Sequence, residues 1–384
     1  MRKIAFTLIP IILSNMFFLT GCWNYREVDN LAIVAGIAID KNKATNKYLL
    51  TSEILKISSG KDGKIESEKL ESDGDTIFDA IRNTIKMSGQ KLYWSHAHIV
   101  VISKDIAKEG ITPILDFLDR QPEPRLNLNV LVSKAETAKE VLMKKTVAGE
   151  ITSFSIDKII DASKATAKLP FERLYNIIND YSSEGKSMSL PTVSVIKNMD
   201  KELLDVSGTA LFNKDKLVGF LSDIETKPFL YAKDELKGGL VCFKVTTDVG
   251  DTLVTLEVTK NKSKIKPAYV NGKIVINIDV NTDATIVEID SAEDLLDDKG
   301  IETIKYFAQK NIEVDIEDII KKVQSEYDTD VFGFGKLVME SMPSHWREVK
   351  DDWDNYFKDL DVNVKSKVNI ASSSDIKTPI KVGD

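Results

Sequence analysis

The hydrophobic pattern changes part-way along the chain, and this change constrains the fold more than any other feature of the sequence. Up to about residue 182, apolar runs such as 31–39 and 99–102 alternate with segments of helical spacing, a pattern typical of α/β structure. From residue 240 onward apolar residues alternate, most clearly at 274–280, which predicts an antiparallel sheet with one face in water. We therefore expect an α+β (mixed α/β), multi-domain protein whose two parts are built differently.

The C-terminal part is predicted to combine a sheet with one long helix. Apolar residues at helical spacing predict an amphipathic helix from about 292 to 326, with a capping box formed by Ser291 and Asp294. This helix is expected to lie on the sheet. The segment 362–368 alternates again, so it is expected to return to the sheet as a strand. The other strands are expected at 240–246, 253–258, 265–270 and 274–289.

Polar and turn-forming residues divide the chain into parts. Residues 182–189 contain Gly185 and several serines, as a connection between elements does. Residues 213–216 are polar and lie between two short apolar runs, which predicts a hairpin. The expected parts are a signal peptide (1–21), an N-terminal α/β domain (22–197), a middle hairpin or connecting segment that could belong to a separate middle domain (198–236), a C-terminal sheet-plus-helix domain (237–372) and a frayed tail (373–384).

The amino terminus has the organisation of an export signal. Arg2 and Lys3 precede an apolar stretch, residues 4–19, which is shorter than the roughly 20 residues that span a bilayer. The stretch ends in small residues before Cys22 and resembles the lipobox of bacterial lipoproteins. This resemblance implies that the sulfur of Cys22 receives a diacylglyceryl group and that cleavage leaves Cys22 as the first residue. Because two acyl chains anchor stably, we expect a soluble body tethered to the outer face of a membrane.

Composition argues against several classes of function. The 384 residues carry a formal charge of −8, opposite to the basic excess of a phosphate-binding protein, so no nucleic-acid partner is expected. Two cysteines and three histidines are too few for a disulfide-stapled scaffold or a cysteine-rich zinc domain.

Once Cys22 carries lipid, Cys242 has no partner within the chain. Its apolar neighbours predict a buried, unreactive thiol.

The residues that carry chemistry in enzymes form no recognisable set. The sequence has no phosphate-binding loop, no dinucleotide-binding glycine motif, no HExxH zinc motif and no nucleophile elbow. His96 and His98 are spaced like metal ligands on a strand, but a structural role is favoured because no third ligand is evident. Trp346 and Trp353 are expected to pack short helices onto the C-terminal sheet or, alternatively, to form an exposed patch for a partner. We expect no catalytic residue, no metal site and no cofactor.

Four sets of residues occur in order along the mature chain. They are Gly21-Cys22-Trp23-Asn24-Tyr25-Arg26-Glu27-Val28-Asp29 running into 34–40; Ser95-His96 with 120–125; Ser207-Gly208-Thr209-Ala210-Leu211-Phe212 with 216–219; and Asp330-Val331-Phe332-Gly333-Phe334-Gly335 with Pro343, Trp346 and Trp353. Together, behind a lipobox, they resemble the Ger(x)C lipoproteins, the C subunits of nutrient germinant receptors in endospore-forming bacteria.

The resemblance implies a three-part mixed α/β ectodomain with no known enzymatic activity. It implies a lipid anchor at Cys22 on the outer face of the spore inner membrane, and assembly with a membrane-embedded A subunit and a transporter-like B subunit. The expected function is that of a non-catalytic subunit which docks with these partners and is needed for nutrient-triggered germination. No ligand-contacting residue carries over from the family, so direct binding of a nutrient is left open.

Two other classes of protein fit parts of the sequence. A lipid-anchored solute-binding protein of a transporter would have this length and anchor, but it should consist of two similar α/β lobes around a cleft. A tethered hydrolase would need a nucleophile or metal constellation, for which His96 is the available starting point. Calorimetric titration with amino acids and sugars separates the first alternative from a receptor subunit.

Overall fold

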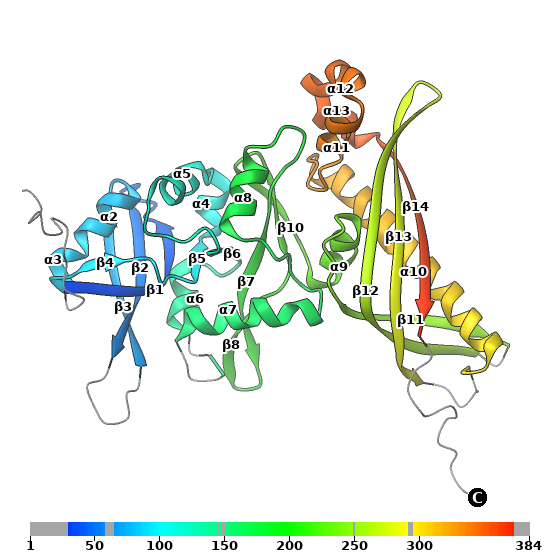
Figure 1. Ribbon diagram of the computed structural model, residues 1–384. Helices are drawn as coiled ribbons and strands as arrows, with labels where there is room; N and C mark the ends of the chain where they lie inside the picture. The colour runs from blue at the N-terminus through cyan, green and yellow to red at the C-terminus, as the bar shows by residue number, and fades with distance from the viewer. Residues whose placement is uncertain are drawn as a thin grey trace, which may run out of the picture.

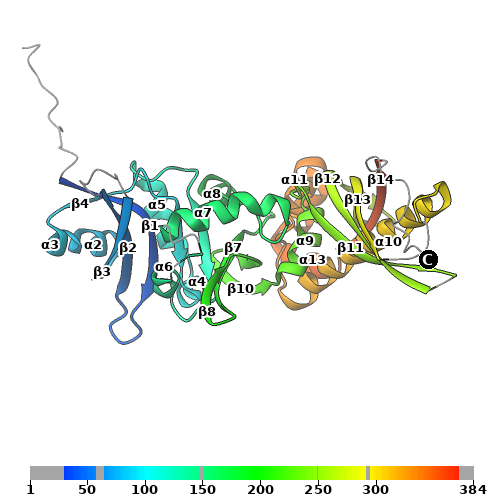
Figure 2. The ribbon, with the colours of Figure 1, turned by 90° about the horizontal axis from the view of Figure 1, so that it is seen from below.

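The computed structural model describes residues 30–57, 65–144, 146–147, 151–248, 250–290 and 295–371. These residues form two β-sheets with helices packed on them, and the sheets lie side by side along the long axis of the molecule (Figure 1, Figure 2). We call residues 30–221, which contain the first sheet, the N-terminal unit, and residues 222–371 the C-terminal unit. The expected mixed α/β fold with more than one unit is confirmed.

The first sheet has ten strands among the described residues. Across the sheet they are β10 (Lys216–Leu221), β9 (Thr209–Asn213), β7 (Ser189–Asn198), β6 (Asn129–Ser133), β5 (Ile99–Ile102), β1 (Leu31–Lys41), β2 (Tyr48–Ile57) and β3 (Ile65–Gly74), with β4 (Lys91–Tyr93) beside β1 and β8 (Lys201–Asp205) beside β7. From β1 through β5 and β6 to β7 the pairing is parallel, and on both sides it is antiparallel. Every residue of β5 and β6 is buried, as expected for parallel strands covered on both faces.

Helices cover both faces of the first sheet and enclose two cores. One face carries α2 (Ile77–Asn83), α4 (Lys104–Glu109), α5 (Thr112–Arg120) and α8 (Leu174–Tyr181), and the other carries α6 (Ala138–Met143) and α7 (Thr152–Ala162). The short helices α3 (Ile85–Ser88) and η2 (Ser163–Ala165) complete the unit within the described residues.

The second sheet has four described strands and one helix-covered face. Its order is β11 (Gly239–Thr247), β12 (Gly250–Val270), β13 (Lys273–Asp290) and β14 (Asp361–Ile370). The first three strands are antiparallel, whereas β14 runs parallel to β13. Alternate residues of β11 are buried and exposed, so one face of the sheet meets water.

A parallel return from β13 to β14 requires a crossover connection, and helices provide it. The connection consists of α10 (Asp298–Glu326), α11 (Phe334–Ser341), α12 (Pro343–Val349), η3 (Lys350–Asp352) and α13 (Trp353–Lys358). The apolar stripe of α10, including Ile304, Ile312 and Ile319, is buried in the C-terminal core. The remaining helix, α9 (Asp223–Ala232), lies between the two sheets and joins the C-terminal core (Figure 1).

Most predicted elements of the C-terminal part are confirmed, with three corrections. The long helix begins at Asp298 rather than near 292, and its expected capping residues, Ser291 and Asp294, lie outside the described residues. The segments 253–258 and 265–270 belong to one continuous strand, β12. The return strand exists but pairs in parallel, so the sheet is not wholly antiparallel.

The segment 198–236 contributes to both units. Its predicted hairpin is confirmed as β9 and β10, and β9 pairs with β7 of the first sheet. The hairpin therefore extends the N-terminal sheet, whereas α9, which follows, packs on the C-terminal core.

Candidate functional site at the joint between the two units

A buried aspartate organises the loop that follows α10. We call residues 329–335 the Asp330 loop. The carboxylate of Asp330 accepts hydrogen bonds from the backbone N–H groups of residues 332–335, at 2.7–3.2 Å, and from Nε1 of Trp353 at 3.1 Å. Gly333 has a φ of 80°, a left-handed conformation that turns successive N–H groups toward one anion. Burial raises the pKa of Asp330 to about 6, although these donors favour the carboxylate.

The Asp330 loop connects the two units through hydrogen bonds. The carbonyl of Asp330 accepts from the backbone N–H of Ser187 at 2.8 Å. The hydroxyl of Thr329 lies 2.8 Å from Oγ of Ser187 and donates to the carbonyl of Phe212 at 3.2 Å. Phe212 and Asp330 come from the third and fourth residue sets identified in the sequence. These sets therefore meet at the boundary between the units, which we call the joint.

Glycines allow close contact across the joint. A Cβ atom on Gly185 would lie 2.7 Å from the carbonyl carbon of Gly335, and one on Gly335 would lie 2.7 Å from the carbonyl oxygen of Gly185. A Cβ atom on Gly219 would lie 2.1 Å from Cε1 of Tyr327. Larger side chains at these positions would push the units apart. Gly219 of the third residue set and Gly335 of the fourth are therefore explained by the close approach of the two units at these positions.

A buried lysine at the end of α9 forms a second connection. Nζ of Lys233 lies 3.3 Å from Oε1 of Glu172 and 3.1 Å from Oε1 of Glu235, and it donates to Oγ of Ser189. Burial raises the pKa of Glu172 to about 7, an effect that Lys233 partly offsets. Burial lowers the pKa of Lys233, but Glu235 and Glu172 more than reverse this and raise it. The lysine therefore stays charged inside the joint.

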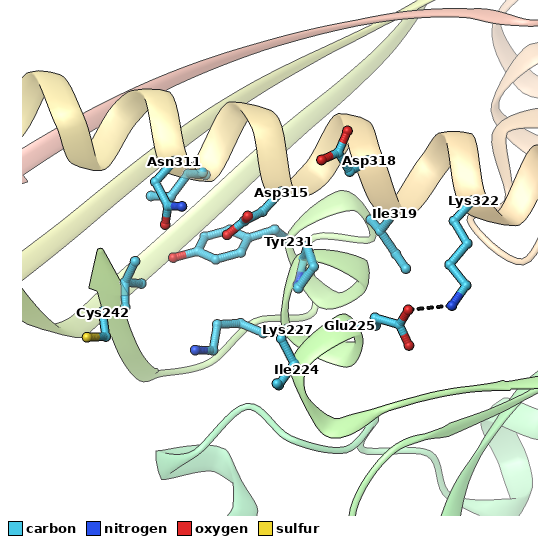
Figure 3. A pocket seen from close by; sticks show the side chains of 13 residues that line it. Ile224, Glu225, Lys227, Tyr231, Cys242, Asn311, Asp315, Asp318, Ile319 and Lys322 are labelled. Carbon is cyan, nitrogen blue, oxygen red and sulfur yellow. Dashed lines mark hydrogen bonds and ion pairs between the residues drawn. The ribbon is translucent and has the colours of Figure 1, made fainter. Parts of the chain in front are cut away.

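A cleft of about 300 Å³ opens beside the joint, between α9, α10 and β11 (Figure 3). We call it the α9–α10 cleft. An ion pair between Glu225 and Lys322 connects the two helices at one end of it. At the other end, Nζ of Lys227 donates to the backbone carbonyl of Leu240 on β11.

The prediction for Cys242 is wrong. Alternation along β11 directs Val241 and Phe243 into the core, which leaves Cys242 exposed on the opposite face. Its apolar neighbours misled the sequence argument because in a strand adjacent residues lie on opposite faces. Cys242 is one of the residues at the edge of the α9–α10 cleft, and in Figure 3 its sulfur points away from the side chains of α9 and α10.

The other residues singled out in the sequence lie in different places. Cys22, the expected lipidation site, lies outside the described residues. Nδ1 of His98 is 2.7 Å from Oδ2 of Asp157, which is also paired with Arg173, whereas His96 is exposed. Among the described residues, no group of three or more His, Cys, Asp or Glu side chains is placed to hold a metal ion. The contact with Asp157 supports the structural role that the sequence favoured for His98.

The core alternative for the C-terminal aromatic residues is confirmed. Trp346, Trp353 and Phe357 are buried, and the rings of Trp346 and Trp353 lie 5.2 Å apart. His345 packs on Tyr269, with ring centroids 4.1 Å apart. These contacts fasten α12 and α13 to the rest of the C-terminal unit.

Sequence reasoning missed the buried pair of Glu172 and Lys233 and the charges of the α9–α10 cleft. Glu172 and Lys233 are 61 positions apart, and each looks like one of many surface charges. The available signal was the position of Lys233 directly after the apolar residues 229–232, where a charge must be either exposed or paired.

Comparison with known proteins identifies the class and then the family. A profile described as "Spore germination protein N-terminal domain" matches residues 24–195, and one described as "Spore germination B3/ GerAC like, C-terminal" matches residues 207–374. The class of protein is therefore that of the spore germination proteins. Because the two profiles match most of the chain in the expected order, the chain belongs to the Ger(x)C family.

Relatives of similar length support this assignment. Spore germination protein KC of Bacillus subtilis is 26% identical, and the match covers 97% of each chain. Spore germination protein B3 of the same organism is 27% identical over 91% of this chain and 94% of its own. The crystal structure of the GerBC protein has the same fold, with a TM-score of 0.54 and 22% identity over 87% of this chain and 96% of that one. These relatives support a role in germination.

No helix among the described residues is long and apolar enough to cross a membrane.

Proposed function

We propose that this chain is a non-catalytic, lipid-anchored subunit of a nutrient germinant receptor. Cys22 carries the anchor, and the body lies at the outer face of the spore inner membrane. There it docks with the integral-membrane A and B subunits and keeps the receptor competent to respond to nutrients. The observation that carries this proposal is the match of two germination profiles, in order, over most of the chain.

The rigid connection between the two units supports a docking role. Hydrogen bonds from the Asp330 loop and the buried charge of Lys233 fix one unit against the other. A body with a fixed shape presents the same surface to its partners at all times, so less entropy is lost on binding. Tethering at Cys22 would also raise the effective concentration of the body near integral-membrane partners.

The architecture favours this proposal over a solute-binding protein. Such a protein should have two similar lobes around a central cleft. Here the ten-stranded and four-stranded sheets of the described residues differ in size, strand order and helix placement. The buried core that includes Phe229 continues across the joint to Leu221 of the N-terminal unit. A cleft of about 450 Å³ at the joint is lined by residues of both units, such as Gly185 and Trp346.

Deletion of the gene tests the germination role. Spores of the deletion strain should fail to germinate with nutrients but should respond normally to a trigger that bypasses nutrient receptors. The wild-type gene should restore the nutrient response. A normal response to every nutrient in the deletion strain, once related receptor genes are also removed, would contradict the proposal.

A cysteine pair tests the anchor. Cys22→Ala should abolish membrane association and reduce the nutrient response, because the body is no longer held beside its partners. Cys242→Ala is the matched control and should leave both unchanged. Spores that carry Cys22→Ala at normal protein levels, with receptor assembly and nutrient response intact, would rule out the anchoring role.

A further inference from the structure

The helices α2 and α3 turn a face of apolar and basic side chains to solvent. Phe78, Arg82 and Lys86 follow one another at intervals of four residues, the spacing of one helix face, and all three are exposed. Met87 is next to Lys86 and is 55% exposed, and Phe78 is 42% exposed. The buried residues of α2 lie on its other side and join the core of the first sheet. We call Phe78, Arg82, Lys86 and Met87 the α2–α3 patch.

The apolar and charged parts of the patch are in contact. Cζ of Arg82 lies 4.9 Å from the centre of the Phe78 ring. In the described part of the chain neither Arg82 nor Lys86 forms an ion pair. The acid on these helices, Asp79, accepts a hydrogen bond from the backbone N–H of Asp75. The patch is therefore locally positive, although the whole chain has a formal charge of −8.

A small apolar groove continues the patch toward α5 and β4. Its volume is about 70 Å³, and Phe78, Trp94 and Phe117 contribute to its lining. The rings of Phe78 and Phe117 lie 6.5 Å apart. Lys91 and Glu123, which also line the groove, are paired with each other. The groove thus adds apolar surface beside the exposed residues of the patch.

The patch lies close to the start of the first strand. Leu31 of β1 pairs with Lys91 of β4, and α3 ends three positions before Lys91. Figure 1 shows α2, α3 and β4 together at the end of the molecule far from the second sheet. The chain from Cys22 to Asn30 spans at most about 28 Å. An anchor at Cys22 would therefore hold the patch within reach of the bilayer surface.

We infer that the α2–α3 patch is a second membrane contact of this chain and binds the surface of an anionic phospholipid bilayer. The inference rests on the anchor at Cys22 that belongs to the proposed function. Phe78 and Met87 enter the boundary between headgroups and acyl chains, and Arg82 and Lys86 pair with lipid phosphates. Scattered exposed apolar residues need no partner, but here they coincide with cations and with the reach of the tether. Two contacts fix which face the body turns to the membrane.

Fluorescence quenching in vesicles tests this contact on the full-length, lipidated chain. In a Cys242→Ala background, Met87→Cys is labelled with the fluorophore NBD, and the chain is reconstituted into phosphatidylcholine vesicles with about one-third phosphatidylglycerol. The matched control is Met199→Cys, an exposed methionine at the turn between β7 and β8. Lipids with a nitroxide near the headgroup should quench the Met87→Cys probe at least about threefold more strongly than the control probe. Equal quenching at the two positions would overturn the inference.

Charge variants test the recognition of phospholipid. Arg82→Gln combined with Lys86→Gln should lower the quenching to the level seen in vesicles of phosphatidylcholine alone, because the attraction to anionic lipid is lost. Lys264→Gln combined with Lys266→Gln, at exposed positions of β12, is the control and should have no effect. Quenching that is independent of phosphatidylglycerol and unchanged in the Arg82 and Lys86 variant would overturn the assignment of an anionic lipid partner.

Flotation of the vesicles separates this inference from the anchor on which it rests. If the wild-type chain floats with the vesicles but the two probes are quenched equally, the patch contact is overturned and the anchor is not. The patch would then be available to a protein partner. If the wild-type chain does not float, both the anchor and the patch contact are overturned. These measurements use purified protein, so their outcome is independent of whether the germination role holds.

Discussion

At the scale of single residues, the joint is unusual because it buries charge. Glu172 has a pKa of about 7 in the folded chain, against an ordinary value of 4.5. A raised pKa means that folding favours the protonated carboxyl. The stability associated with it is present below about pH 4.5 and is lost as the pH rises to about 7.

Glu172→Gln should remove this pH dependence. Between pH 5 and pH 8, the wild-type chain should lose up to about 3 kcal/mol of unfolding free energy relative to the variant. Urea midpoints of the full-length chain in detergent, measured across that range, give the difference. Glu302→Gln, at an exposed position, is the control. If wild type and Glu172→Gln have parallel pH profiles, the burial and the raised pKa assigned to Glu172 are contradicted.

Asp330 is the residue whose loss should be most damaging. Asp330→Ala would leave five N–H donors buried without their acceptor, and we expect a loss of about 3 kcal/mol or more. Trp353→Phe removes one of these donors and part of the buried ring, so its effect should be smaller, about 1–2 kcal/mol. Thermal unfolding of both variants tests the order, and an equal loss in the two would mean that the backbone donors contribute little.

At the scale of elements, the joint depends on close approach between β10 and the end of α10. Gly219→Ala should displace the Tyr327 ring and cost about 1–3 kcal/mol, because a Cβ atom would overlap it. Tyr327→Leu in the same chain should recover part of this loss. Val218→Ala is the neighbouring control at a half-exposed position. If Gly219→Ala unfolds at the same urea concentration as wild type, the contact is not tight in solution.

Elements were predictable where local pattern decides the structure. The alternation around Ile274 predicted the second sheet, and the helical spacing around Ile312 and Ile319 predicted its long helix. Both could be predicted because an element that buries one face must repeat its apolar residues with the period of a strand or of a helix. The parallel pairing of β14 was not predictable, because a strand's sequence does not specify the direction of its partner. The exposure of Cys242 depended on strand phase within an apolar run, which the sequence alone left undecided.

The candidate site was predictable only as a set of motifs. Asp330 and Gly333 were singled out by resemblance, but their hydrogen-bonding role needs the loop geometry. The pairings of Lys233 with Glu172, and of Phe212 with Thr329, join residues that are distant in sequence. Nothing in a single sequence indicates which of many charged or polar residues will meet across such distances.

At the scale of the whole molecule, the β9–β10 hairpin decides where the N-terminal unit ends, and the sequence analysis placed this hairpin in the segment 198–236 rather than in the N-terminal domain. The hairpin of β9 and β10 completes the first sheet, so we propose that the N-terminal unit extends to Leu221. Ala210, Leu211 and Phe212 on β9 are fully buried. A chain cut before β9 would lose these contacts and expose the backbone edge of β7.

Two fragments of the chain test this boundary. A fragment of residues 24–221 should be soluble and should unfold cooperatively in urea, because its sheet is complete. A fragment of residues 24–206 should aggregate or unfold without a clear transition, because β7 becomes an unprotected edge and the apolar residues beneath β9 meet water. Circular dichroism during urea titration and sedimentation provide the readouts. Equal cooperativity in the two fragments would show that the hairpin is dispensable to the first sheet, and the unit boundary would then lie before residue 207.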